Sequence, residues 1–267
     1  MIGNLLLRGM IAGMIAALLT FGFAQIFGEP PIEAAIAIEA QGEAAPDHAA
    51  TQPGAHDHGT HDHGAQAAAA GHDHGEGAGI TRATQSGLGL LTGLVIFGAA
   101  LGGAFAVAFA LLHGRLGPAS PLALSIVLGV AGFVVLGLIP GLKYPANPPA
   151  VGSGETIGLR TGLFFLLVAA SFASAMIAVS AGKALAPTQG GIRAAIIALA
   201  LFAGLIAVTS LVLPSYNEVP ADFPADVLMR FRLASLGTQA VLWLGIGAIF
   251  GLWVNRRPGG APRPIAA

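Results

Sequence analysis

The sequence contains no cysteine and few charged residues of either sign. Without cysteine, the chain has no disulfide, thiolate zinc site, iron–sulfur cluster or cysteine nucleophile. Asp, Glu, Lys and Arg make up 9% of the 267 residues, whereas they make up about 25% of an ordinary soluble domain. Because so little charge could not keep a globular protein of this length in water, a soluble single domain is excluded.

Catalytic and nucleotide-binding signatures are missing as well. The chain has no HExxH motif, no nucleophile elbow and no phosphate-binding GxxxxGK[ST] loop. Its formal net charge of −1 gives no case for nucleic-acid binding. We therefore expect neither an enzyme nor a nucleic-acid-binding protein, and we expect no tightly bound cofactor.

Apolar sequence, in contrast, is abundant. Hydrophobic residues make up 55% of the chain, and the mean hydropathy is +0.77. A membrane-spanning helix needs about 20 mostly apolar residues, and no apolar stretch alternates with the period of two that a barrel strand requires. The sequence predicts an all-α, polytopic membrane helix bundle in the lipid bilayer. Its six expected transmembrane helices are 5–27, 87–112, 121–139, 161–181, 192–213 and 233–254.

These spans divide the chain into a first helix (1–27), an outer loop (28–86), a five-helix membrane bundle (87–254) and a cytoplasmic tail (255–267). The first helix has an alternative interpretation as a signal peptide, whose cleavage would leave five helices. However, its apolar run after Arg8 is about twice as long as a typical signal core, and no small-x-small cleavage site follows it cleanly. We expect it to be retained.

The scarce charges differ between the two sides of the predicted membrane. Loops 28–86, 140–160 and 214–232 contain all 13 acidic residues and five basic ones, a net charge of −8. The other side contains both termini and loops 113–120 and 182–191, with seven basic residues and no acidic one. Since basic residues favour the cytoplasmic side, we expect both termini in the cytoplasm and the acidic loops outside.

Seven of the eight histidines lie in a low-complexity segment of the first outer loop, residues 47–76. Six of them form three copies of a His-Asp-His-Gly unit, and the surrounding Ala, Gly, Pro and Gln predict disorder. Imidazoles with nearby carboxylates suit Co²⁺, Ni²⁺ and Zn²⁺. The candidate metal ligands are His48, His56, Asp57, His58, His61, Asp62, His63, His72, Asp73 and His74. The alternative is a spacer whose histidines do nothing essential.

A cluster of glutamates follows the first span, at residues 28–39. Pro30 and Pro31 predict the end of that span and the start of a short helix at the outer interface, because proline is tolerated in a first helical turn. Glu29, Glu33 and Glu39 would offer oxygen ligands at the mouth of a pathway. Helix capping and ordinary solvation explain these carboxylates more simply on the residues alone.

Two proline-rich loops follow the third span, expected to end at Pro140, and the fifth span. They hold both tyrosines of the chain, Tyr144 and Tyr216. Rigid turns with polar groups predict a shaped cap, and interfacial anchoring by tyrosine fits equally well. The candidate ligands in these loops are Asn147, Glu155, Asn217 and Glu218.

The predicted spans hold only mild polar residues in their interiors. No Asp, Glu, Lys or His lies well inside a span, although proton-coupled carriers usually place an ionisable group there. Helix packing explains most of the polar residues that are present. Gln25 and Gln239 are the better candidates for lining a pathway.

Three segments resemble the CbtA family of probable cobalt transporter subunits: GEPPIEAAIAIE (28–39), LKYPANPPAVGSGETIGLRT (142–161) and LPSYNEVPADFPADVLMRFRLASLGTQAVLW (213–243). The resemblance covers most of the chain except the His-rich insert and the extreme C-terminus. It implies a bacterial inner-membrane protein that acts in cobalt uptake, linked to cobalamin synthesis, with a small single-span CbtB-like partner. The matched positions are Glu29, Glu33, Glu39, Lys143, Tyr144, Pro145, Asn147, Glu155, Arg160, Asn217, Glu218, Arg230 and Arg232.

The leading hypothesis is a membrane subunit of a divalent-metal uptake transporter, with cobalt as the expected cargo. In it, the periplasmic His/Asp loop collects the metal, and the outer carboxylates pass it to a pathway among the helices. The alternative is a non-transporting membrane metal-binding or assembly protein that buffers metal outside the membrane. The lack of an intramembrane ionisable group favours this alternative, whereas the resemblance and the patterned outer face favour transport.

Overall fold

The computed structural model describes residues 2–44, 81–115 and 119–255, and within these ranges all regular structure is helical. Six helical stretches are long and apolar enough to cross a membrane, which confirms the predicted all-α bundle with six spans. The helices and π-helical segments are α1 (Ile2–Phe23), η1 (Ala24–Gly28), α2 (Glu29–Ala44), α3 (Arg82–Thr84), η2 (Gln85–Gly89), α4 (Leu90–Leu112), α5 (Pro121–Gly132), η3 (Phe133–Leu138), α6 (Ile139–Lys143), α7 (Ile157–Gln189), α8 (Gly191–Val212) and α9 (Ala225–Asn255).

The first helix does not end at its two prolines, so the predicted separate interfacial helix is wrong. α1, η1 and α2 follow one another without a break. A proline has no N–H to bond the carbonyl four residues back, and its ring clashes with that carbonyl in a regular α-helix. Here the turn before Pro30 is π-helical, because the Glu29 N–H bonds to the Ala24 oxygen five residues back. The wider turn admits the proline rings, and the helix continues.

The third span passes through Pro140 in the same way, so the expectation that it ends there is also wrong. η3 precedes α6, and the Ile139 N–H bonds to the Val134 oxygen five residues back. The span therefore reaches Lys143. Its start follows the usual pattern, since the Ser120 side chain accepts a hydrogen bond from the Ala123 N–H at 3.1 Å.

Several spans begin earlier than the apolar sequence indicates, and two of these bear on the site described below. α7 begins at residue 157 rather than 161, and α9 begins at residue 225 rather than 233. Asp226 lies in the first turn of α9, where the helix dipole stabilises a carboxylate. Polar first turns are therefore helical although their hydropathy is low. As a consequence Arg160 and Arg232, which we expected in loops, lie on helices.

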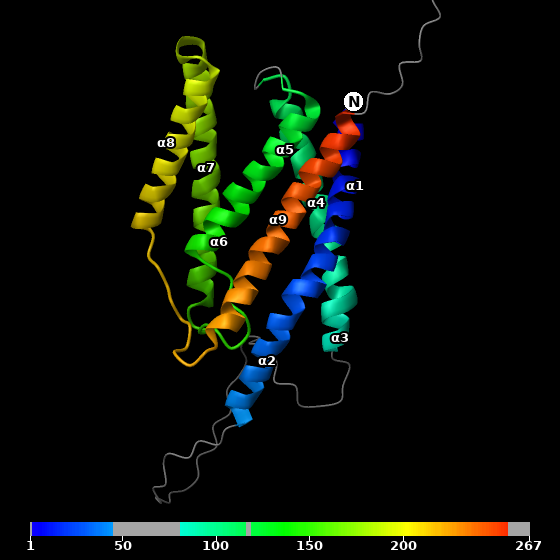
Figure 1. Ribbon diagram of the computed structural model, residues 1–267, viewed down its shortest axis with the longest axis vertical. Coiled ribbons are helices and arrows are strands. Elements are labelled where there is room, and N and C mark those ends of the chain that lie inside the picture. The colour runs from blue at the N-terminus through cyan, green and yellow to red at the C-terminus, as the bar shows by residue number, and fades with distance from the viewer. Residues whose placement is uncertain (1, 45–80, 116–118, 256–267) are drawn as a thin grey trace, which may run out of the picture.

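The helices run between two ends of the molecule that differ in charge (Figure 1). The start of α1, the end of α9 and the α7–α8 turn lie at one end, here called the basic end. α2 and the two proline-rich loops lie at the opposite end, here called the acidic end. The acidic residues in the described part of the chain all belong to the acidic end: Glu29, Glu33, Glu39, Glu43, Glu155, Glu218, Asp222 and Asp226.

α1, α4, α5 and α9 pack together into one unit, here called the body. α1 and α4 approach so closely that a Cβ atom on Gly13 would lie 1.9 Å from the Gly98 oxygen, and one on Gly102 would lie 2.0 Å from the Gly9 oxygen. Small residues allow such a close approach, and the resulting van der Waals attraction holds helices together in lipid. α5 and α9 meet in the same manner at Gly129 and Gly247.

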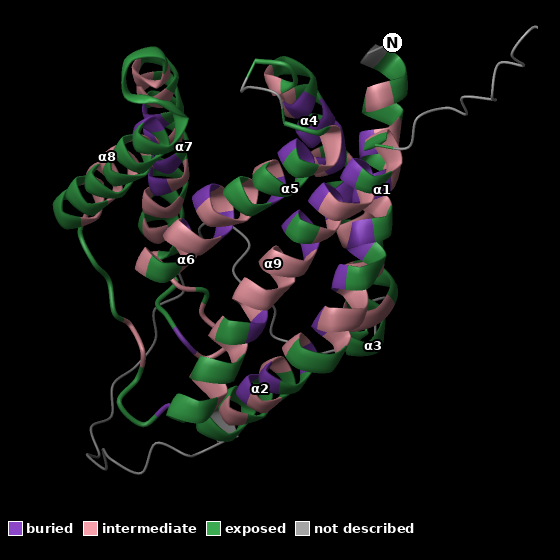
Figure 2. Ribbon diagram, turned by 45° about the horizontal axis from the view of Figure 1, so that its top comes forward, coloured by how far each residue is buried: buried purple, intermediate pink, exposed green. Residues whose placement is uncertain are grey.

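α7 and α8 form a second unit, here called the hairpin. The two helices pack along one another, and the hairpin contacts the body mainly through η3 and α6. In α8 only Ala194 is buried. Figure 2 accordingly shows the buried residues concentrated in the body, while the hairpin is largely exposed.

Candidate ligand-binding pocket

A cavity of about 430 Å³ lies where the hairpin joins the body, near the acidic end. Its walls come from η3, α6, α7, α9 and the two proline-rich loops. Sites for small molecules commonly have volumes of about 300–1,000 Å³. The cavity is therefore large enough for a small organic ligand and not only for a bare ion.

Two helix faces supply side chains to this cavity. α7 contributes Ile157, Arg160, Thr161 and Phe164, and α9 contributes Arg232, Ser235, Leu236 and Gln239. Both sets have the spacing i, i+3, i+4 and i+7, which places four side chains on one face of an α-helix. The early starts of α7 and α9 bring the two arginines onto these faces.

The proline-rich loops close the cavity and are tied to each other. The Tyr144 hydroxyl donates to the Pro214 carbonyl at 2.7 Å, and the Lys143 ammonium donates to the Ser215 hydroxyl at 2.6 Å. Burial, with a smaller contribution from nearby Tyr216, raises the pKa of Tyr144. The phenol therefore keeps its proton and remains a donor.

Glu218 fastens the second loop to the start of the hairpin. Its carboxylate accepts hydrogen bonds from the Thr156 hydroxyl and from the Ser153 N–H, the latter at 3.0 Å. It also forms an ion pair with Arg160, with 3.3 Å between Nε and Oε2. The Thr156 bond, then the Ser153 bond and then the Arg160 charge lower the pKa of Glu218, so the carboxylate is ionised at neutral pH.

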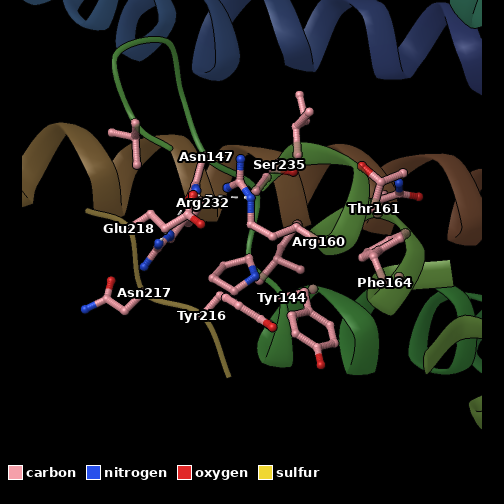
Figure 3. Close-up of a pocket in the computed structure, with 18 of the residues that line it drawn as sticks. Tyr144, Asn147, Arg160, Thr161, Phe164, Tyr216, Asn217, Glu218, Arg232 and Ser235 are labelled. Carbon is pink, nitrogen blue, oxygen red and sulfur yellow. Dashed lines mark hydrogen bonds and ion pairs between the residues drawn. The ribbon is translucent and has the colours of Figure 1, made fainter. Parts of the chain in front are cut away.

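Arg232 lies in the same part of the cavity wall, beside Asn147 (Figure 3). Its Nη2 donates to the Asn147 Oδ1 at 3.2 Å. Its Nε is buried and has no hydrogen-bond partner among the described residues. The guanidinium is therefore held by one neutral acceptor and retains unused donors.

The structure brings four of the candidate ligands from the sequence together and leaves the others apart. Asn147, Asn217, Glu218 and Gln239 line the cavity. Glu155, in contrast, is exposed on the loop before α7 and does not line it.

The candidates on the first helix lie elsewhere. Glu29 is buried and forms an ion pair with Arg82, and the Gln25 side chain donates to the Ser86 carbonyl. Glu33 and Glu39 are exposed on α2. Among these residues, Glu29 and Gln25 tie the first helix to the segment that leads into α4.

The ten histidine and aspartate candidates between His48 and His74 lie outside the described residues. Within the described ranges, no group of three or more His, Asp or Glu residues is placed to hold a metal ion. The metal-collecting role of segment 47–76 therefore stays a prediction.

Four polar residues of the cavity were not among the candidate ligands from the sequence, although two of them, Arg160 and Arg232, were among the positions matched to the family: Arg160, Thr161, Arg232 and Ser235. Arg160 and Arg232 were assigned to loops because hydropathy falls near the helix ends. The signal that would have found them is the helical spacing that links Arg160 to Phe164 and Arg232 to Gln239, once both segments are taken as helices.

The fold and the cavity define a multi-pass membrane protein with a polar pocket between two groups of helices. The chain matches the family described as "Probable cobalt transporter subunit (CbtA)" over residues 2–255, and it belongs to this family. No match was found among curated proteins or among solved structures. Family membership confirms the resemblance seen in the sequence, and the description of the family as a transporter subunit implies partner subunits.

Proposed function

We propose that this chain is the membrane subunit of a cobalt-uptake system and that the cavity receives the cargo from the acidic side. The observation that carries the proposal is the position of the cavity, between the hairpin and the body and beside a π-helical segment. Leu136 and Gly137 of η3 line it, and π-helical segments within α-helices are frequently found at functional sites.

The charge distribution supports an orientation with the acidic end outside. Arg8, Arg115, Lys183 and Arg193 lie at the basic end, where the described residues include no acid. In a bacterial inner membrane, the positive-inside rule would place this end in the cytoplasm. Segment 47–76 would then lie in the periplasm, where its histidines and aspartates would collect Co²⁺, or Ni²⁺ or Zn²⁺.

The partner that we propose is a small single-span CbtB-like subunit. The hairpin offers room for one, since α8 packs on α7 and leaves most of its surface exposed. In lipid, a further helix packs against such a surface through van der Waals contacts. Co-purification of the two subunits from membranes would test the partnership. If the partner still binds when a cross-linked group covers the exposed face of α8, the contact lies on another part of the chain.

Cobalt uptake by cells that express the chain with its partner tests the transport function. We expect uptake above that of cells lacking the chain, and reduced uptake at low cobalt concentration when residues 47–76 are deleted. Uptake equal to that of cells lacking the chain contradicts the transport function. Unchanged uptake by the deletion variant contradicts only the collecting role of the segment.

The second candidate function is a membrane metal-binding or assembly protein that does not itself transport. The charged lining of the cavity favours the absence of transport, because its two arginines and one glutamate do not suit the passage of a bare cation. Reconstituted vesicles discriminate between the two functions, because the second candidate predicts cobalt binding without cobalt flux.

A further inference from the structure

The cavity carries more positive than negative charge, although it lies near the acidic end. Its lining contains the guanidinium groups of Arg160 and Arg232 and the carboxylate of Glu218. Divalent cations in proteins are held by carboxylate, carbonyl, imidazole or thiolate ligands, and guanidinium groups repel them. The charge of the lining therefore favours an anionic ligand.

The carboxylate of Glu218 already has hydrogen-bond and ion-pair partners within this chain. Its carboxylate pairs with Arg160 and accepts hydrogen bonds from Ser153 and Thr156. Arg160 and Glu218 thus neutralise each other as a pair. The positive charge that the lining leaves uncompensated belongs to Arg232.

Arg232 has no carboxylate partner in the ranges that the structure describes. The ion pairs found there involve Arg82 and Arg160, whereas Arg232 donates to the neutral amide of Asn147. The Arg232 side chain is half-buried and its Nε is fully buried, and a charge withdrawn from water without a counter-ion is costly. A guanidinium presents parallel N–H donors that match the two oxygens of a carboxylate.

The rest of the cavity suits the organic part of such a ligand. Phe164, Tyr216 and Leu236 provide apolar and aromatic surface. Ser235 and Gln239 provide neutral polar groups on the same face of α9 as Arg232. One uncompensated positive charge in the lining is balanced by a ligand with one net negative charge.

We propose that the cavity binds a small organic carboxylate, which the Arg232 guanidinium contacts while Asn147 orients that guanidinium. The carboxylate belongs either to a free organic acid or to a carboxylate chelate of Co²⁺. Citrate provides a probe for both sources, since the citrate trianion and Co²⁺ form a complex with a single net negative charge. This inference deepens the proposed function by naming the chemical form of the cargo, and it rests on that function for the identity of the metal.

Equilibrium binding to the full chain in lipid nanodiscs tests the inference, by calorimetry with sodium citrate, cobalt citrate and cobalt chloride. The matched variants are Arg232→Gln and Arg230→Gln, because Arg230 is exposed on the same helix and does not line the cavity. We expect Arg232→Gln to weaken binding of a citrate probe by about tenfold or more. Arg230→Gln should leave binding unchanged. Arg232→Lys, which keeps the charge without the fork of donors, should weaken binding less than Arg232→Gln.

Each outcome of the binding experiment supports or overturns the inference. Tighter binding of cobalt citrate than of sodium citrate identifies the chelate as the source, and equal binding identifies the carboxylate alone. No binding of either citrate probe, unchanged binding by the Arg232 variants, or an equal loss in Arg230→Gln overturns the inference. If Arg232→Gln does not fold, the Arg232→Lys variant decides. Cobalt uptake without citrate binding overturns this inference alone, and citrate binding without uptake contradicts the proposed function instead.

Discussion

The body and the hairpin hold their helices together in different ways. In the body, α1 and α4 touch backbone to backbone at Gly13 and Gly98, and Phe105, Phe109 and Phe250 fill the core beside them. In the hairpin, α8 buries only Ala194, and the nearest comparable approach is a Cβ on Gly182 at 3.0 Å from the Ala198 Cβ. One unit is closely packed, and the other is attached along one side.

This difference explains where the cavity lies. The closely packed glycines of the body leave no room for a ligand, whereas the junction between hairpin and body is bridged by loops and by a few side chains. A shift of the hairpin would change the cavity without breaking the glycine contacts of the body. The ties that resist such a shift include the bonds of Glu218 to Thr156, Ser153 and Arg160 and the bonds of Tyr144 and Lys143 to the loop after α8.

The largest expected effect comes from adding a methyl group inside the body. We expect Gly13→Ala to lower the free energy of unfolding by about 2–3 kcal/mol, because the new Cβ would meet the Gly98 carbonyl and force the helices apart. Gly22→Ala in the same helix has nothing within 4 Å and should change it by less than about 0.5 kcal/mol. The measurement is reversible unfolding in detergent.

The same substitution in the hairpin sharpens the comparison. Gly204 lies in α8 with nothing within 4 Å of a Cβ, so Gly204→Ala should behave like Gly22→Ala. Equal destabilisation by Gly13→Ala and Gly204→Ala would show that the two units do not differ in packing.

A smaller effect is expected at the junction. Glu218→Ala removes an acceptor from Ser153, Thr156 and Arg160, so the loop before α7 should open more often. We expect faster amide hydrogen exchange in residues 150–160 and unchanged exchange in α1 and α4. Unaltered hydrogen exchange in residues 150–160 would mean that Glu218 does not hold the start of the hairpin to the loop between α8 and α9.

The smallest effect concerns pH. Because the pKa of Glu218 is lowered in the folded protein, its carboxylate stays ionised through the ordinary titration range of glutamate, at about pH 4.3. Its hydrogen bonds and ion pair are lost only as the pH falls through the lowered pKa. A fluorophore on Gly154→Cys, in this cysteine-free chain, should lose anisotropy only in that acid range. Thr156→Val removes the largest cause of the shift and should move the loss to higher pH. The same midpoint in both proteins would contradict this assignment.

The sequence was sufficient for the number of spans, because long apolar runs and the separation of acids from bases are direct consequences of a bilayer. It was insufficient at Pro30, Pro31 and Pro140, because hydropathy carries no information on a π turn that admits a proline. It also placed Arg160 and Arg232 in loops, since polar first turns have low hydropathy whether or not they are helical.

The cavity is formed by residues from segments that lie far apart in the sequence. Asn147, Asn217 and Glu218 were proposed from the sequence as ligands of one shaped cap and Gln239 as a separate pathway candidate, and nothing local in their segments indicated that they share one cavity with Arg232. Their assembly follows from the packing of η3, α7 and α9 around the two loops. The contacts that define the site are therefore tertiary.

Cobalt uptake by cells that express Ser235→Cys, before and after treatment with a membrane-impermeant thiol reagent, tests the central claim most directly. Ser235 lines the cavity, and the chain has no other cysteine. Gly154→Cys, on the exposed loop outside the lining, is the matched control. If the cavity receives the cargo from the acidic side, modification of Ser235→Cys abolishes most uptake while modification of Gly154→Cys does not. Full uptake by the modified Ser235→Cys protein, with the label confirmed by mass, would contradict the account.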